Sequence, residues 1–183
     1  MDFDQRYSPA TLTAMQRELE SIMRACSLDI QWRLLDTSTS QETFNNLVVA
    51  RFRGKCQGDA PEALAPRPKT LGLTHLSEGE ILPFSEVNCD RVRNFVQPKL
   101  THENRFRVDQ LLGRALGRVL AHELYHMLAR TGVHGHTGVA KPVLTPNDLV
   151  SGQLRLEDAQ SEGIRRSLRQ AGLPAIASAS AAK

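Results

Sequence analysis

Long hydrophobic runs are absent from this chain of 183 residues, and so is a basic-then-apolar leader at its beginning. Without a run of about 20 apolar residues, we expect no segment that spans a membrane. Without a leader, we expect either a cytoplasmic protein or the mature domain of an exported bacterial protein, and the residues do not choose between the two. The apolar share of 40% is ordinary for a folded chain, so we expect one domain over residues 1–174 and a disordered tail over 175–183.

Cysteine is scarce, with three residues and no CxxC spacing, which argues against a structural zinc site built on cysteine. Cys56 and Cys89 each follow a segment that has the pattern of a strand. The two can form a disulfide if the protein is exported, and three reduced thiols are the alternative. Cys26 lies on the apolar face of a predicted helix, so we expect it to be buried.

Aromatic residues are rare where positive charge is concentrated. The formal net charge is +3, and basic side chains outnumber acidic ones between Arg91 and Arg118. Only Phe95 and Phe106 interrupt this stretch, and it matches no nucleic-acid-binding motif. We interpret it as a solvated face and expect no nucleic-acid partner.

The periodicity of the remaining apolar residues predicts an α+β chain. Helical spacing begins at Ser8-Pro9, and alternation typical of strands recurs up to residue 87. A loop rich in proline and glycine, residues 54–70, separates the second strand from the third. Pro83 favours an edge position or a bulge for its strand. The predicted helices are 9–26, 90–96, 109–130, 146–149 and 157–171, and the predicted strands are 30–35, 47–52, 71–76 and 81–87.

The motif His122-Glu123-Leu124-Tyr125-His126 is the strongest chemical signal in the chain. On a helix, residues four apart share one face, about 5.4 Å apart along the axis, so both imidazoles can reach one metal ion. The Glu beside the first His is placed to act as a base on metal-bound water. A shuffled chain of this composition would contain only about 0.01 such matches, which disfavours coincidence.

The surroundings of the motif are those of a long, buried helix. Asp109 can cap its start, no proline follows before Arg130, and Gly132 suits a left-handed C-terminal cap. The alternative is a helix with two chance histidines. That reading would leave Glu123 buried on an apolar helix without compensation.

A catalytic zinc ion usually takes three protein ligands and leaves one position open. His122 and His126 supply two. His134 is our first choice for the third, because a chain leaving the helix through a cap can turn back towards the metal. The other candidates are His136, Asp148, Glu157 and Glu162.

With His122, Glu123 and His126, the chain resembles the zincins, the superfamily of HExxH zinc metallopeptidases, and in particular small bacterial zincin-like domains. This resemblance implies a mixed sheet, antiparallel at its edge, packed on a backing helix and an active-site helix. The edge strand, residues 71–76 or 81–87, would run along the cleft. A ligand just past the helix is loosely metzincin-like, but Ala129 and Gly132 stand where that clan has Gly and His, and no Met follows Met127.

The resemblance implies a zinc-dependent endopeptidase with one catalytic Zn²⁺ ion on His122, His126 and His134. Glu123 would activate the zinc-bound water, and a peptide or protein substrate would lie along the edge strand. We expect a monomer with no membrane partner. The alternatives are a catalytically silent zinc-binding module and a hydrolase of another amide.

Overall fold

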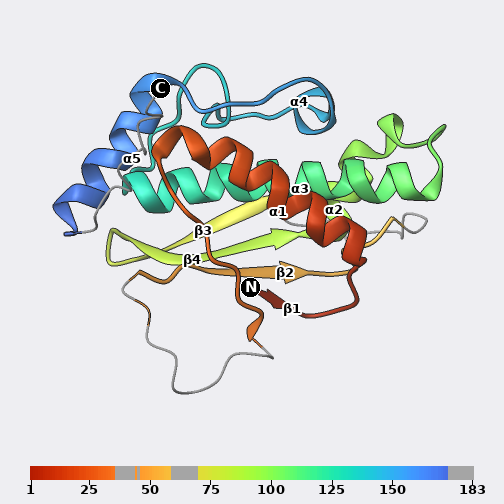
Figure 1. The fold of residues 1–183 in the computed structure, drawn as a ribbon, viewed down its shortest axis with the longest axis horizontal. Coiled ribbons are helices and arrows are strands. Elements are labelled where there is room, and N and C mark those ends of the chain that lie inside the picture. Colours follow the sequence, from red (N-terminus) through yellow and green to blue (C-terminus); the bar gives the residue numbers. More distant parts are fainter. Residues whose placement is uncertain (36–43, 45, 59–69, 173–183) are drawn as a thin grey trace, which may run out of the picture.

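The computed structural model describes residues 1–35, 44, 46–58 and 70–172, and these form an α+β fold (Figure 1). Two long helices, α1 and α3, lie together on one face of a four-stranded sheet. In chain order the elements are β1 (Asp2–Phe3), α1 (Pro9–Met23), β2 (Val49–Arg53), β3 (Gly72–Ser77), β4 (Glu80–Asn88), α2 (Cys89–Val96), α3 (Arg105–Ala129), α4 (Pro146–Val150) and α5 (Asp158–Gln170), with short 3-10 turns at Arg24–Cys26 and Gln97–Lys99.

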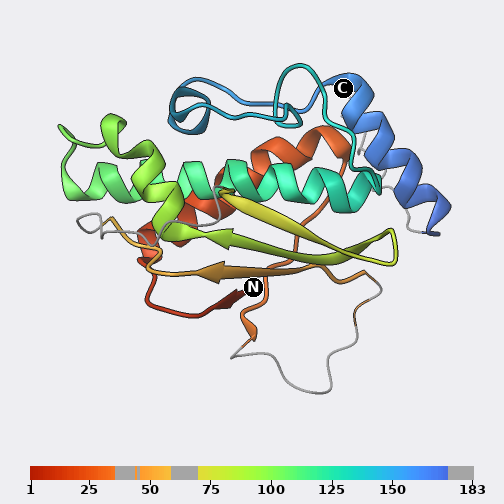
Figure 2. The ribbon, with the colours of Figure 1, turned by 180° about the vertical axis from the view of Figure 1, so that it is seen from behind.

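The sheet is mixed, with the strand order β1-β2-β4-β3. β1 and β4 both pair with β2 in parallel, and β3 pairs with β4 in antiparallel. β1 and β3 are therefore the two edge strands, and in Figures 1 and 2 β3 is the edge that lies beside α3. The sequence offered residues 71–76 or 81–87 as the edge strand along the cleft. The second choice is wrong, because β4 lies inside the sheet. Pro83 is tolerated there because it precedes the first β2–β4 pair and faces the register shift of β3 between Thr74 and Leu76.

The predicted strand at residues 30–35 is wrong. Its backbone is bound to the N-terminus instead, where Leu35 N donates to Met1 O at 2.8 Å and the Met1 amine donates to Arg33 O at 2.6 Å. The place beside β2 is taken by β1. A strand of two residues has no periodicity, so the sequence does not indicate it.

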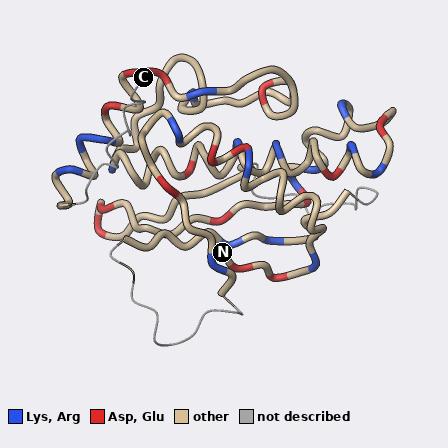
Figure 3. Tube along the Cα trace, in the orientation of Figure 1, with Lys and Arg blue, Asp and Glu red and all other residues tan. Residues whose placement is uncertain are grey.

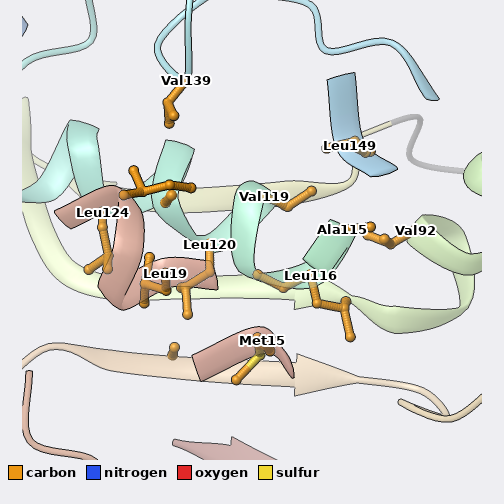
Figure 4. Close-up of a cluster of buried hydrophobic side chains, with 14 of the residues drawn as sticks. Met15, Leu19, Val92, Ala115, Leu116, Val119, Leu120, Leu124, Val139 and Leu149 are labelled. Carbon is orange, nitrogen blue, oxygen red and sulfur yellow. The ribbon is translucent and has the colours of Figure 1, made fainter. Parts of the chain in front are cut away.

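The core lies between the sheet and the two long helices. Figure 4 shows Met15 and Leu19 of α1 beside Leu116 and Leu120 of α3. The helices approach closely because α3 carries glycines on the shared face: a Cβ on Gly117 would lie 2.7 Å from Met15 O. α1 therefore backs α3 as expected.

α3 is longer than predicted and both of its ends differ from the prediction. It begins at Arg105, where the Asn104 side chain accepts a hydrogen bond from Arg107 N, and it ends at Ala129 with Arg130 in the left-handed conformation at φ 48°. Gly132 therefore does not form the cap. Asp109 is buried inside the helix and accepts hydrogen bonds from Ser8, Thr11 and Gly58. A carboxylate with distant donors cannot be distinguished from a capping one by sequence pattern alone.

A disulfide joins Cys56, just after β2, to Cys89, at the start of α2, with Cα atoms 5.0 Å apart. Cys26 is a buried free thiol. The predicted tail 175–183 and most of the predicted loop 54–70 lie outside the described residues. Within the described part of the chain, no helix has the length and apolar character needed to cross a bilayer.

The basic stretch is only partly a solvated face. Lysines and arginines colour the start of α3 and also α5 in Figure 3. Two arginines of the stretch, Arg93 and Arg118, are only 1% exposed. Arg93 binds Asp90 at 2.6 Å, and Arg118 binds Glu18 at 2.6 Å. These two cations therefore hold elements together inside the protein.

Candidate metal centre

Three histidines meet at the C-terminal end of α3. His122 and His126 lie one helical turn apart, and their Nε2 atoms are separated by 3.1 Å. His134 follows the helix, and its ring centroid is 4.8 Å from that of His126. One ligating atom from each of the three residues lies within 4.8 Å of the others. The spacing of four residues on a helix produces the first pair, and the turn after the helix adds the third member.

The turn that carries His134 is held by hydrogen bonds to the last turn of α3. Thr131 N donates to His126 O at 3.1 Å, which follows from the left-handed conformation of Arg130. Tyr125 Oη donates to Val133 O at 3.1 Å. Tyr125 therefore positions the residue that precedes His134, a role that the motif alone does not indicate.

Both helical histidines have a defined tautomer. The Nδ1 atom of His122 lies 2.8 Å from Val139 O, and that of His126 lies 2.7 Å from Thr131 O. A carbonyl oxygen only accepts, so each Nδ1 must carry the proton and each Nε2 must present a lone pair. Carbonyl partners of this kind orient the histidine ligands of metal sites.

The environment of His122 and His126 favours binding of a cation. Burial lowers the pKa of His122 and of His126, with the charge of His134 adding to the effect and the backbone carbonyls opposing it. Both rings are therefore neutral near pH 7, which is the form that binds metals. Two Nε2 lone pairs then face each other at 3.1 Å without a proton between them. A cation placed between them would remove this repulsion, so the residues present fit a metal ion.

Glu123 lies beside the cluster and is 6% exposed. Burial raises the pKa of its carboxyl, although the Thr74 hydrogen bond opposes the rise, as do the imidazoles of His126 and His134 when they are protonated. Its Oε2 accepts the Thr74 hydroxyl at 2.6 Å. A carboxylate with a raised pKa is a stronger base than an exposed one, which suits proton transfer near neutral pH.

The histidines and Glu123 line a cleft of about 600 Å³. One wall comes from the edge strand β3 and the adjacent Ile81, and the other from residues 141–144. The lining is mostly apolar. Among the described lining residues, Lys141 is the only one with a basic side chain of the lysine or arginine type. Lys141 is bound to Asp148 at 2.5 Å. The cleft therefore suits an apolar molecule that reaches the histidines.

The other predicted ligands are not part of the cluster in the described chain. His136 is exposed and is outside the group of three. Asp148 forms a capping box with Thr145 at the start of α4, and Glu157 forms another with Gln160 at the start of α5. Glu162 binds Arg165 at 3.0 Å and Arg169 at 2.6 Å. Each of these carboxylates already has a structural partner.

Residues 130–157, which we call the return segment, run back over α3 towards α4 and then return to α5 (Figure 1). A ridge of donors spaced four residues apart on α3 binds its backbone carbonyls. His126 reaches Thr131 O and His122 reaches Val139 O. One turn earlier, Arg118 donates to the carbonyls of Asp148, Ser151 and Gly152 at 2.6 to 2.8 Å.

The sequence interpretation missed Arg118 as a determinant of the site. The available signal was the spacing of Arg114, Arg118, His122 and His126 at four-residue intervals, which places all four on one face. Arg114 continues the pattern by donating to Val150 O at 2.9 Å. The same ridge that presents the histidines thus fixes the segment that supplies His134.

No family model, no curated protein and no solved structure matches this chain.

Proposed function

We propose that this protein is a zinc-dependent peptidase of the zincin type, with His122, His126 and His134 as the metal ligands and Glu123 as the general base. The observation that carries the proposal is the pair of facing Nε2 atoms, 3.1 Å apart, beside a buried carboxylate in an open cleft. A helix with two chance histidines would not need both rings to be oriented by carbonyl oxygens, nor a third ring brought against them.

The arrangement of elements supports the same proposal. A mixed sheet with an antiparallel edge strand lies against the helix that carries the motif, and a second long helix backs it. These are the features that the resemblance to zincins implies.

Zinc is the ion that we propose, because three histidine ligands with a position left open form a known ligand set of catalytic zinc. When bound, zinc would act as a Lewis acid that polarises a carbonyl and lowers the pKa of water. His122, His126 and His134 would hold it. Glu123 would take the proton of the attacking water and deliver it to the leaving amine.

The substrate that best fits the cleft is an extended peptide with apolar side chains. One side of β3 is paired with β4, and no described strand pairs with its other side. Main-chain groups on that side can bind a peptide as an added strand. Leu73 and Leu76 of β3 are 50% and 65% exposed, so apolar side chains of a peptide would find apolar partners there.

The test combines metal content with hydrolysis. Wild type and Glu123→Gln, purified without added metal, are analysed for zinc and assayed on fluorescence-quenched peptides that carry apolar residues around the scissile bond. We expect about one zinc per chain in both proteins, and at least about a 100-fold lower kcat in the variant, the lower bound typical of acid–base catalysis.

Each other outcome excludes the proposal in a different way. Zinc without hydrolysis of any peptide would favour a binding module, and hydrolysis of non-peptide amides alone would favour another hydrolase. A fully active Glu123→Gln would exclude Glu123 as the base. A wild type that binds no zinc even when the ion is added would overturn the metal site itself.

A further inference from the structure

Two residues of the edge strand contact the carboxylate of Glu123. Gly72 and Thr74 are two positions apart on β3, so both face the same side of the sheet. That side faces α3, because Thr74 binds Glu123 and a side chain on Gly72 would collide with it. The edge strand therefore does more than form a wall of the cleft.

The Thr74 hydroxyl lies near two oxygens of Glu123 and donates to the carboxylate. It donates to Oε2 at 2.6 Å and lies 3.3 Å from the Glu123 backbone oxygen. The short distance is typical of a hydroxyl donating to a charged carboxylate. In the described part of the chain no hydrogen bond reaches the other oxygen, Oε1, which leaves Oε1 available to a molecule in the cleft.

Gly72 leaves room for that second oxygen. A Cβ at this position would lie 2.6 Å from Glu123 Oε1 and 2.9 Å from Val119 Cγ1. Real Cβ atoms do not approach other atoms so closely, so any side chain here would displace the carboxylate or α3. The glycine is required by close approach, since its φ is not in the left-handed region.

We propose that Thr74 is a positioning residue for Glu123: the Gly72–Thr74 pair holds Oε2 from the edge strand and turns Oε1 towards the reacting molecule. This inference rests on the proposed function, because it assigns Thr74 a part in the reaction that Glu123 would perform. A base held in one orientation is not distributed over unproductive rotamers. Misplacement of a catalytic group by about 1 Å can lower the rate about 100-fold.

The alternative role of Thr74 is structural only. A buried carboxylate needs a hydrogen bond for stability, whatever it does in catalysis. The two roles differ in kinetics: a positioning role acts on kcat at unchanged zinc content and KM, whereas a structural role changes the amount of folded, zinc-loaded protein.

The experiment measures zinc content, kcat and KM for Thr74→Val, which removes the hydroxyl at equal volume, and for Thr74→Ser, which keeps it. The matched control is Ser85→Ala. Ser85 faces Thr74 across the β3–β4 pair, is buried, and its hydroxyl has no hydrogen-bond partner in the described structure. The substrate is the quenched apolar peptide, and all proteins are used with zinc bound.

We expect Thr74→Val to keep its zinc and its KM within about threefold and to lose about 10- to 100-fold in kcat, part of the 100- to 10,000-fold that a general base contributes. Thr74→Ser and Ser85→Ala should stay within about threefold of wild type. An unchanged kcat in Thr74→Val would overturn the positioning role alone, and so would an equal loss in Thr74→Ser. A wild type inactive on every peptide would instead overturn the proposed function.

Thermal unfolding gives a reading that does not depend on activity. Thr74→Val should lower the melting temperature more in the wild-type background than in the Glu123→Ala background, because the hydrogen bond from Thr74 to the Glu123 carboxylate exists only in the first. Equal shifts in both backgrounds would show that Thr74 does not hold Glu123, and would overturn the inference even if Thr74→Val were too unstable for kinetics.

Discussion

The two helical imidazoles form an unfavourable pair unless a cation lies between their Nε2 atoms, which are 3.1 Å apart. Their Nδ1 protons are committed to the carbonyls of Val139 and Thr131, so lone pairs meet at Nε2. His134 differs from both, because it is exposed and comes from the return segment. The candidate site thus has two preorganised imidazoles and a third that depends on a turn, and that turn is held by Tyr125.

His134 offers a sharp test at the residue scale, because its removal should disturb the metal and little else. We expect His134→Ala to weaken zinc binding by more than about 100-fold, the upper range seen when only an outer-shell partner of a ligand is lost. The melting temperature of the metal-free protein should stay near that of wild type, since the side chain is exposed.

The measurement is a competition titration with a chromophoric chelator. His136→Ala is the matched control, two residues away and also exposed, and it should bind zinc as wild type does. If His136→Ala lost the metal and His134→Ala kept it, the ligand assignment would have to be exchanged.

The return segment is the element on which the site depends most. It has little regular structure apart from α4, yet it supplies His134, the carbonyl for His122 and one wall of the cleft. Arg118 holds its far half against α3, and α4 is capped by Asp148 and Thr145. Backbone carbonyls bound to a helix ridge thus replace the sheet or helix contacts that other elements have.

Asp148 makes the stability of this element dependent on pH. Burial alone would raise the pKa of Asp148, but hydrogen bonds from Lys141 and Thr145 outweigh it and lower the pKa to about 2. A depressed pKa means that the ionised form stabilises the folded state. The contribution is complete above the ordinary value of 3.8 and is lost as the pH falls through about 2.

We therefore expect Asp148→Asn to lower the melting temperature by a few degrees at pH 7. The difference in melting temperature between the variant and wild type should decrease steadily between about pH 4 and pH 2. Circular dichroism across this range measures it. The exposed Asp29 serves as control through Asp29→Asn. A gap that stays constant down to pH 2 would contradict the role given to the Asp148 carboxylate.

At the level of the whole molecule, the Cys56–Cys89 disulfide joins the end of β2 to the start of α2. It closes a loop that contains both β3 and β4. The edge strand that contacts Glu123 therefore belongs to the covalently closed part. Both sulfurs are buried, at 1% and 0% exposure of their residues. The bond restrains the segment that joins the sheet to the site.

Removing this bond should destabilise the entire fold. For a loop of 33 residues, chain entropy predicts a loss of about 3 to 4 kcal/mol in unfolding free energy. We expect this loss in the double variant Cys56→Ala/Cys89→Ala, in which alanine avoids burying a hydroxyl. Urea unfolding with and without reductant measures it. Reductant should destabilise wild type and leave the double variant unchanged, and a wild type equally stable with its disulfide reduced would contradict the estimate.

Much of the fold follows from local pattern. The start of α1 with proline in its first turn, the hairpin around Glu78-Gly79, and the starts of α4 and α5 all depend on residues within four positions of one another. The two helical histidines and Glu123 also follow from local pattern, because helical geometry alone brings His122 and His126 together. The helices, the β3–β4 hairpin and the group of His122, Glu123 and His126 can therefore be predicted without knowledge of the packing.

Contacts between distant residues were decided only by the tertiary structure. β1 belongs to the sheet and residues 30–35 do not, and β4 lies inside the sheet, so that Pro83 stands at an irregularity of the β3–β4 pair and not at an edge. Thr74 meets Glu123 across 49 residues, and Arg118 meets the return segment across 30 or more. No periodicity records such pairs, because they depend on which surfaces remain free once helices and strands pack. The pairing of Cys56 with Cys89, and the approach of His134 rather than His136 to the helical pair, were settled by that packing.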